Sequence, residues 1–336
     1  MNTSLPAARL RTFLSRRTEI RAVVFLVLVL VYAAVWQPDV LQRYDVTLAR
    51  IALDGLVALG LTLVILQGEL DLSVGSVLAA SGAVLALTPD LALGIVLALA
   101  LGVAVGALNA VLVVVLKVNS FIATLGTMFA VRGLAFVLTD GQPVPIKDIE
   151  SGIAFGQALL GPLTPRVLFF VVVFLALHVF LTRTRAGREF YAVGGNRQAA
   201  IDAGLPVRRR LATSFVMCAV LASCAGIINT LELTSADPTA GSTVMLVSIA
   251  SAVVGGVLLN GGRGTIVGAL IGAAALGILQ ISLDFGGYNP EIKNILVGAV
   301  LFVAVATDPS SLRIVRDRLK ELLGRLLGRA APQRQN

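Results

Sequence analysis

Long apolar runs with almost no charge recur along the chain and constrain its fold more than any other feature. A helix needs roughly 17 to 25 residues to cross the hydrocarbon core of a bilayer, which is about 30 Å thick. Ten runs lie within or close to that length, at residues 21–37, 45–66, 71–88, 91–116, 120–139, 165–182, 210–231, 243–259, 264–283 and 291–307. Only 14% of the 336 residues are charged and 57% are hydrophobic, which is unlike a soluble domain. The sequence therefore predicts an all-α integral membrane protein, a polytopic bundle of about ten transmembrane helices.

Two of these runs are at the short end of the range. Residues 71–88 and 243–259 are close to the minimum length and contain glycine. Each is expected either to cross the bilayer fully or to be a broken or re-entrant segment.

The basic residues predict the orientation of the chain. If ten spans alternate from an N-terminus that is inside, 21 of the 27 Lys and Arg residues fall on that side, five fall on the other side and Arg132 falls within a span. Basic loops stay on the cytoplasmic side. We therefore expect a cytoplasmic leader (1–20), a transmembrane domain (21–308) and a cytoplasmic tail (309–336). The net charge of +8 is explained by this topology, and no nucleic-acid binding is expected.

Two loops are long enough to carry a function. The outer loop, 140–164, is rich in turn residues and is expected to be a lid or a docking surface. The inner loop, 183–210, contains Gly194 and Gly195, which can break the chain, and Asn196, a good helix N-cap. A helix of about two turns is predicted from Arg197 to Ala203, ended by Gly204. Such a short helix is marginal alone, so it either docks on a partner or only connects two spans.

Three separated blocks of sequence resemble one known family. The first, GELDLSVGS at residues 68–76, matches a Gly-x-x-Asp-Leu-Ser-Val-Gly-Ser signature through Gly68, Asp71, Leu72, Ser73, Gly75 and Ser76. The second is FIATLGT at 121–127, followed by Arg132 and Gly133. The third is YAVGGN at 191–196, with Ala199, Ala200 and Gly204. Together they resemble the permease subunits of ABC-type sugar importers, in the ribose branch of the binding-protein-dependent systems.

This resemblance implies that the chain is one subunit of a transporter complex in a bacterial inner membrane. It implies a second permease chain, identical or related, a separate ATPase with two tandem nucleotide-binding domains, and an extracytoplasmic binding protein that selects the solute. It also implies that the short inner helix couples to the ATPase through Gly194, Gly195, Asn196, Ala199, Ala200 and Gly204. None of the four lysines lies in a phosphate-binding loop, which agrees with a chain that is no enzyme and needs no cofactor.

The first block can also be interpreted physically. Glu69 and Asp71 lie where a span begins and are expected to act as acidic groups at a helix N-terminus, with the Ser73 hydroxyl nearby, in a cap that fixes a tight entry beside Gly75. A direct part in gating or coupling is the alternative. Glu69 departs from the apolar or amide residue typical of the ribose branch, and a similar pattern occurs in relatives that resemble rhamnose permeases.

A pathway for a neutral, hydroxyl-rich solute needs hydrogen-bonding side chains and little net charge. Asn109, Thr124, Thr127 and Asn229 are the candidates, and helix-to-helix hydrogen bonding is the alternative role for each. Arg132 is expected near the end of its span, with its head group in the interface.

Two other classes of protein fit less well. A secondary transporter driven by an ion gradient would need intramembrane carboxylates, and Asp54 and Asp284 lie near span ends. A membrane enzyme or a metal site would need a convergent set of reactive or ligating groups, and the chain has one His and two Cys.

Overall fold

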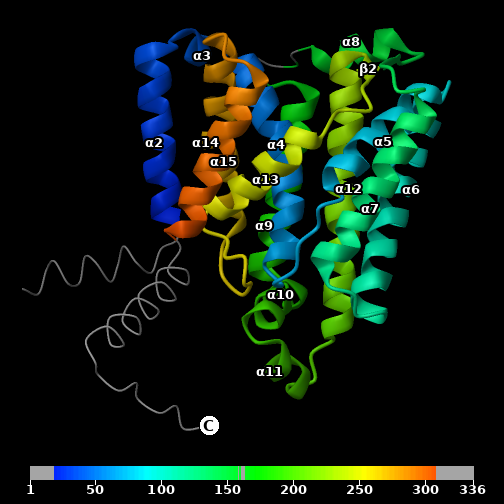
Figure 1. Ribbon diagram of the computed structural model, residues 1–336, viewed down its shortest axis with the longest axis vertical. Coiled ribbons are helices and arrows are strands. Elements are labelled where there is room, and N and C mark those ends of the chain that lie inside the picture. The colour runs from blue at the N-terminus through cyan, green and yellow to red at the C-terminus, as the bar shows by residue number, and fades with distance from the viewer. Residues whose placement is uncertain (1–18, 158, 160–162, 308–336) are drawn as a thin grey trace, which may run out of the picture.

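The computed structural model describes residues 19–157, 159 and 163–307, so most of the predicted leader and all of the predicted tail lie outside the described residues. Two short strands and a series of helices make up the described part (Figure 1). They are α2 (Glu19–Trp36), α3 (Asp39–Gln42), α4 (Tyr44–Ile65), α5 (Val74–Leu87), α6 (Leu91–Ala110), the π-helix η1 (Val111–Val115), α7 (Ser120–Leu138), β1 (Val144–Pro145), α8 (Ile149–Gly156), α9 (Pro165–Arg183), α10 (Arg185–Gly195), α11 (Arg197–Asp202), α12 (Val207–Leu233), β2 (Ser235–Ala236), α13 (Ser242–Val254), α14 (Ile266–Phe285) and α15 (Pro290–Ala306).

The prediction of an all-α membrane fold is confirmed at the level of its helices. Each of the ten predicted runs holds a helix, and seven helices in the described ranges are long and apolar enough to cross a membrane: α2, α4, α6 with η1, α7, α9, α12 and α14. The other three are shorter, with 14 residues in α5, 13 in α13 and 17 in α15.

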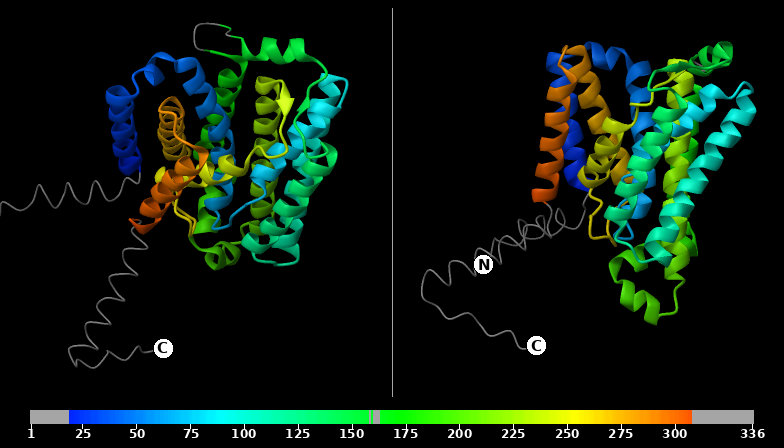
Figure 2. Two further views of the ribbon diagram at one scale, coloured as in Figure 1. Left: turned by 45° about the horizontal axis from the view of Figure 1, so that its top comes forward. Right: turned by 45° about the vertical axis from the view of Figure 1, so that its right-hand side comes forward.

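The centre of the bundle is formed by α4 and α12. Helix α12 packs on α4, α5 and α6, and α4 also contacts α9, α13 and α14. Helix α2 lies on one side of the bundle and α6 and α7 lie on the other (Figure 2). Most of α4 is buried, whereas these outer helices leave apolar side chains such as Leu28 and Phe129 exposed. An apolar exterior around a buried apolar centre is the arrangement that a bilayer stabilises.

The two short helices begin beside each other inside the bundle. Residues 66–73 lead from the end of α4 back into the bundle to α5, and residues 237–241 lead from β2 inward to α13 (Figure 1). A methyl group on Gly75 would lie 2.3 Å from the carbonyl oxygen of Gly241, which itself has φ +83°. At about 1.5 Å per residue neither helix reaches the ~30 Å of a hydrocarbon core, and each is preceded by a non-helical segment that contains turns.

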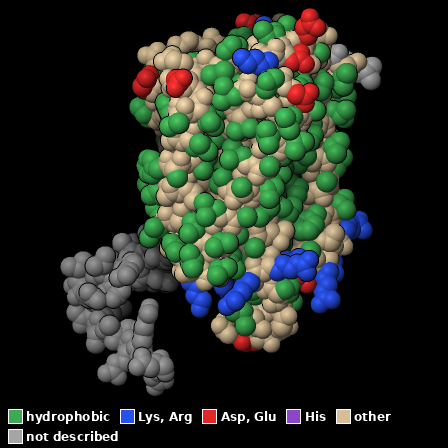
Figure 3. Space-filling model, turned by 90° about the vertical axis from the view of Figure 1, so that its right-hand side faces the viewer, with side chains coloured by type: hydrophobic (Ala, Val, Ile, Leu, Met, Phe, Trp, Pro, Cys, Tyr) green, Lys and Arg blue, Asp and Glu red, His purple; other side chains and the backbone are tan. Residues whose placement is uncertain are grey.

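The two ends of the bundle differ. At one end β1 pairs with β2 in an antiparallel ribbon, next to α8, so the loop 140–164 carries two short elements of its own. At the other end α10 and α11 protrude (Figure 1). We call these the α8 end and the α11 end. Lys and Arg side chains gather at the α11 end, and Asp and Glu side chains mostly at the α8 end (Figure 3).

The prediction for the inner loop was right for α11 and wrong for the residues before it. Helix α11 begins at Arg197, the Asn196 side chain accepts from the Ala199 N–H, and Gly204 has φ +71°. Gly194 and Gly195, however, do not break the chain, because α10 continues through both of them. The small size of Gly194 allows a close contact with other segments, described next.

Candidate coupling and translocation sites

Gly194 lies where α10 meets two loops from distant parts of the sequence. A methyl group there would stand 1.8 Å from the Leu66 carbonyl oxygen and 2.6 Å from the Gly262 nitrogen. The Gly262 N–H also donates to the Leu66 carbonyl at 2.8 Å. The segment that leads to α5, the loop between α13 and α14, and α10 thus meet backbone to backbone. We call this contact the glycine junction; its members are Gly68, Gly194, Gly195, Gly261 and Gly262.

Polar contacts reinforce the same junction. Arg197, the first residue of α11, donates to the Gln67 carbonyl at 3.1 Å and to Glu69 Oε1 at 2.7 Å. The Gln67 side chain donates to the Arg210 carbonyl at 3.1 Å. Glu69, the residue that departs from the ribose-branch pattern, therefore pairs with the start of α11.

Glu189 fixes α10 to the start of α12. Its carboxylate accepts from Arg210 Nε at 2.5 Å and from Arg185 Nε at 3.1 Å, and its side chain is only 7% exposed. The hydrogen bond from Arg210, followed by its charge and by Arg185, lowers the pKa of Glu189 despite burial. Helices α10, α11 and α12 therefore form one braced unit.

The predicted coupling residues form the outer part of this unit. Ala200 is buried against Val193, Val207 and Leu211. Asn196, Ala199 and Gly204 are exposed, and the Ile201 side chain is 51% exposed at the tip. An exposed small and apolar face on a braced helix can seat in a partner protein.

The first motif block forms a buried polar network with two of the long helices. Asp71 is fully buried and its Oδ1 accepts from the Ser73 N–H at 2.9 Å and from Ser73 Oγ at 2.6 Å. Asn109 Nδ2 on α6 donates to Ser73 Oγ at 2.9 Å and Thr127 Oγ1 on α7 donates to Asn109 Oδ1 at 2.7 Å. The Leu72 N–H donates to Thr124 Oγ1 at 3.1 Å.

Three of the four candidate pathway residues thus belong to this network. Asn109 and Thr124 hold segment 66–73 against α6 and α7. Thr127 on α7 donates to Asn109 on α6, which is the helix-to-helix role. The prediction that Asp71 caps the helix is wrong, because α5 begins at Val74 with Ser73 as its N-cap residue and no side-chain cap hydrogen bond. Asp71 instead accepts from Ser73 in the turn that precedes α5. Gly75 lies at the contact with Gly241, and the Ser76 hydroxyl is buried behind it.

Asn229, the fourth candidate, is separate from this network and lines a cavity at the α8 end. The cavity, of about 290 Å³, lies between α4, α12, the start of α13, α14 and α15. Polar side chains dominate its lining: Arg50, Asn229, Asp237, Thr239, Ser242, Thr243, Gln280, Asp284, Lys293 and Asn294.

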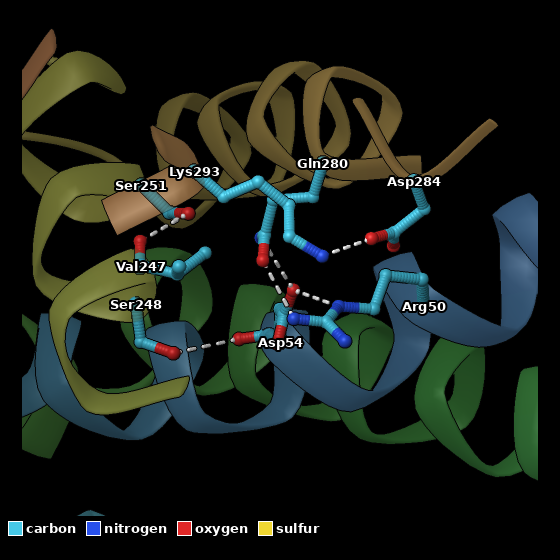
Figure 4. A network of polar contacts seen from close by, with 8 residues as sticks. All are labelled: Arg50, Asp54, Val247, Ser248, Ser251, Gln280, Asp284 and Lys293. Carbon is cyan, nitrogen blue, oxygen red and sulfur yellow. Dashed lines mark hydrogen bonds and ion pairs between the residues drawn. The ribbon is translucent and has the colours of Figure 1, made fainter. Parts of the chain in front are cut away.

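An ionic network on the wall of this cavity was missed from the sequence. Arg50 Nε donates to Asp54 Oδ2 at 2.8 Å, Arg50 Nη2 donates to Gln280 Oε1 at 2.6 Å, and Gln280 Nε2 donates to Asp54 Oδ2 at 3.2 Å (Figure 4). The i, i+4 spacing of Arg50 and Asp54 within an apolar run was the available signal. Gln280 could not be joined to it, because that residue comes from α14, far along the chain.

Arg132 also differs from expectation. Its guanidinium donates to the carbonyls of Pro238 at 2.8 Å and Ala240 at 2.7 Å. It therefore holds the turn that leads to α13, instead of extending to an interface, because those carbonyls lie before the helix and need a donor.

Comparison with known proteins places the chain in a family. Residues 44–305 match the family model described as the permease component of the branched-chain amino acid transport system. The chain belongs to this permease family. As a transport permease component it is not itself catalytic. The match includes the cavity, the buried network and the braced unit of α10, α11 and α12.

The most similar relatives include permeases of sugar import systems. The ribose import permease protein RbsC of Escherichia coli K12 is 42% identical over 269 residues, 78% of this chain and 84% of that protein. The inner membrane ABC transporter permease protein YjfF of the same strain is 37% identical over 264 residues, 75% of this chain and 79% of that protein. The L-arabinose transport system permease protein AraH of the same strain is 35% identical over 262 residues, which are 77% of this chain and 80% of that protein. No solved structure matches the chain. These relatives favour an importer permease and not the ion-gradient alternative.

Proposed function

We propose that this permease forms the translocation pathway of an ATP-driven importer for a sugar or sugar-like solute. Relatives at 35% to 42% identity that cover most of the chain are named for ribose and for L-arabinose. The chain also has a cavity at the α8 end of its apolar bundle that is lined by many polar side chains, as a route for a hydroxyl-rich solute requires.

The observation that carries this proposal is the braced unit of α10, α11 and α12. Helix α11 offers an exposed face to a partner, while Gly194 and Arg197 connect it to the segment before α5 and to the loop after α13. A push on α11 by a separate ATPase, with two tandem nucleotide-binding domains, would therefore reach both short helices.

The basic α11 end is the cytoplasmic face in this proposal, since basic loops stay inside. Both termini are then cytoplasmic and the chain crosses a bacterial inner membrane ten times. The α8 end receives an extracytoplasmic binding protein, and a second permease chain, identical or related, completes the pathway.

The test is reconstitution of the permease with its ATPase and binding protein in proteoliposomes. Ala199→Arg places a bulky charge on the exposed face of α11, and we expect it to lower binding-protein-stimulated ATP hydrolysis at least tenfold. The matched variant Ala199→Ser keeps a small side chain and is expected to retain stimulation. Uptake that proceeds without ATP and collapses when the proton or sodium gradient is dissipated would refute the proposal. A thermal-shift screen of the binding protein against pentoses, hexoses and polyols would name the solute.

A further inference from the structure

The cavity at the α8 end has features of a binding site. It lies between five helices, and its volume of about 290 Å³ is near the lower limit, ~300 Å³, of pockets that hold small molecules. Ionisable residues within a bilayer are rare and usually face such a cavity or a water-filled path. Here Arg50 lies within the candidate span α4 and reaches the cavity wall.

The charges around the cavity offset one another. Arg50 is paired with the fully buried Asp54, and Lys293 forms an ion pair with Asp284. Asp237 accepts from the Thr239 N–H and hydroxyl, both at 2.7 Å. The lining therefore provides many directed donors and acceptors with little net charge, which suits a neutral solute better than an anion.

Arg50 is held in a fixed position. It donates hydrogen bonds to Asp54, which is 0% exposed, and to Gln280, which is 4% exposed. The Arg50 side chain itself is 28% exposed. A preorganised planar guanidinium offers its remaining N–H groups in a fixed geometry, which favours paired acceptors such as neighbouring hydroxyl oxygens.

Asn229 supplies the complementary group. It is half-buried on α12 and lines the cavity, and its side chain makes no hydrogen bond within the part of the chain that the structure describes. An amide both donates and accepts, as a hydroxyl does. Asn229 and Arg50 thus present unused hydrogen-bonding groups to one space, and that of Arg50 is fixed.

We propose that this cavity binds a neutral, polyhydroxylated solute during its passage, with Asn229 and Arg50 contacting the solute and Asp54 and Gln280 positioning Arg50. The inference rests on the proposed function, since it assigns a site to the solute that the importer carries. It moves the contact from the buried network of Asn109, Thr124 and Thr127 to the cavity at the α8 end.

The first experiment tests the cavity without any transport. Asn229→Cys, made in a chain with Cys218 and Cys224 replaced by alanine, is treated in intact cells with a membrane-impermeant thiosulfonate. We expect it to be labelled from outside, and Thr127→Cys, in the buried network, to remain unlabelled. An unlabelled Cys at position 229 in a folded protein would overturn the site.

The second experiment measures uptake of D-ribose, L-arabinose and D-ribose 5-phosphate by the complete importer in proteoliposomes. Asn229→Ala should lower the sugar taken up per ATP hydrolysed about tenfold, whereas Asn289→Ala, which removes an exposed amide outside the cavity, should not. Wild-type uptake of the phosphate ester but not of the neutral sugars would overturn the assignment to a neutral solute. If wild type takes up none of the three, the proposed function fails for these sugars and the labelling still decides the cavity.

A double variant separates solute contact from a structural role for Arg50. Arg50→Gln alone leaves Asp54 as an uncompensated buried charge and can prevent folding. Arg50→Met with Asp54→Leu removes both charges at similar volume, a replacement that stability often tolerates. We expect the double variant to fold and to lose uptake about tenfold. Normal uptake by the folded double variant would show that the pair only holds helices together and would overturn the role of Arg50.

Discussion

At the scale of single residues, Gly194 has the least room for a larger side chain of any position in the coupling region. The atoms that a larger side chain would meet belong to the backbone of Leu66 and Gly262, which cannot rotate away as a flexible side chain can. Helix propensity would favour alanine at this position, so the requirement for glycine comes from tertiary contact.

We therefore expect Gly194→Ala to destabilise the permease. The methyl group would overpack the glycine junction, which costs about 1–3 kcal/mol or more, and should lower the thermal unfolding midpoint in detergent. The matched control is Gly195→Ala, because nothing lies within 4 Å of a methyl group there. Equal midpoints for the two variants would contradict the backbone contact.

Asn109 provides a second prediction at this scale. It donates to Ser73 and Asp71 and accepts from Thr127, so Asn109→Ala would leave buried polar groups without partners. We expect a loss of about 1–3 kcal/mol in the free energy of unfolding. Asn109→Asp should be worse, because it places a second carboxylate beside Asp71. If Asn109→Ala instead lowered solute uptake at unchanged thermal stability, Asn109 would be a pathway residue.

The sequence reveals local signals more readily than it reveals contacts. Asn196 and Gly204 bound α11 by interactions within a few residues, and α11 was predicted correctly. Asp71 is recognisable as a motif residue, but its partner Asn109 lies 38 positions away, so the sequence leaves Asn109 open between a pathway role and helix-to-helix hydrogen bonding. Gly194 was interpreted as a helix break because its real constraint, the Leu66 carbonyl, comes from another part of the chain.

At the scale of elements, α10 depends on the carboxylate that fixes it to α12. Arg210 and Arg185 hold the pKa of Glu189 below its ordinary value of 4.5. A group with a depressed folded pKa stabilises the fold above its unfolded pKa, and this contribution is lost as pH falls through the folded pKa.

We therefore expect the unfolding midpoint to fall as pH is lowered through and below about 4.5. Glu189→Gln, which cannot titrate, should have a lower midpoint at pH 7 and a smaller fall below it. Thermal unfolding of both proteins over this pH range measures the difference, and parallel curves would contradict the role of Glu189.

At the scale of the whole molecule, the two ends of the bundle should face opposite sides of a membrane. The basic α11 end is expected inside and the α8 end outside. Single cysteines at the exposed positions Ala199 and Ile153 test this directly. A membrane-impermeant thiol reagent added to intact cells should label Ile153→Cys, and label Ala199→Cys only after the cells are opened. Labelling of both in intact cells would contradict the topology.

The meeting of α5 and α13 has an electrical consequence. Each helix carries a partial positive charge, about half an elementary charge, at its N-terminus, and Gly75 brings the start of α5 against Gly241 at the start of α13. Positive helix ends at membrane depth repel protons and metal cations. The carboxylates of Asp71 and Asp237 lie near these two starts and offset part of this charge, whereas the Arg132 guanidinium at the Ala240 carbonyl adds to it. We expect solute uptake without an accompanying ion leak, and a proton or sodium conductance during uptake in proteoliposomes would contradict this.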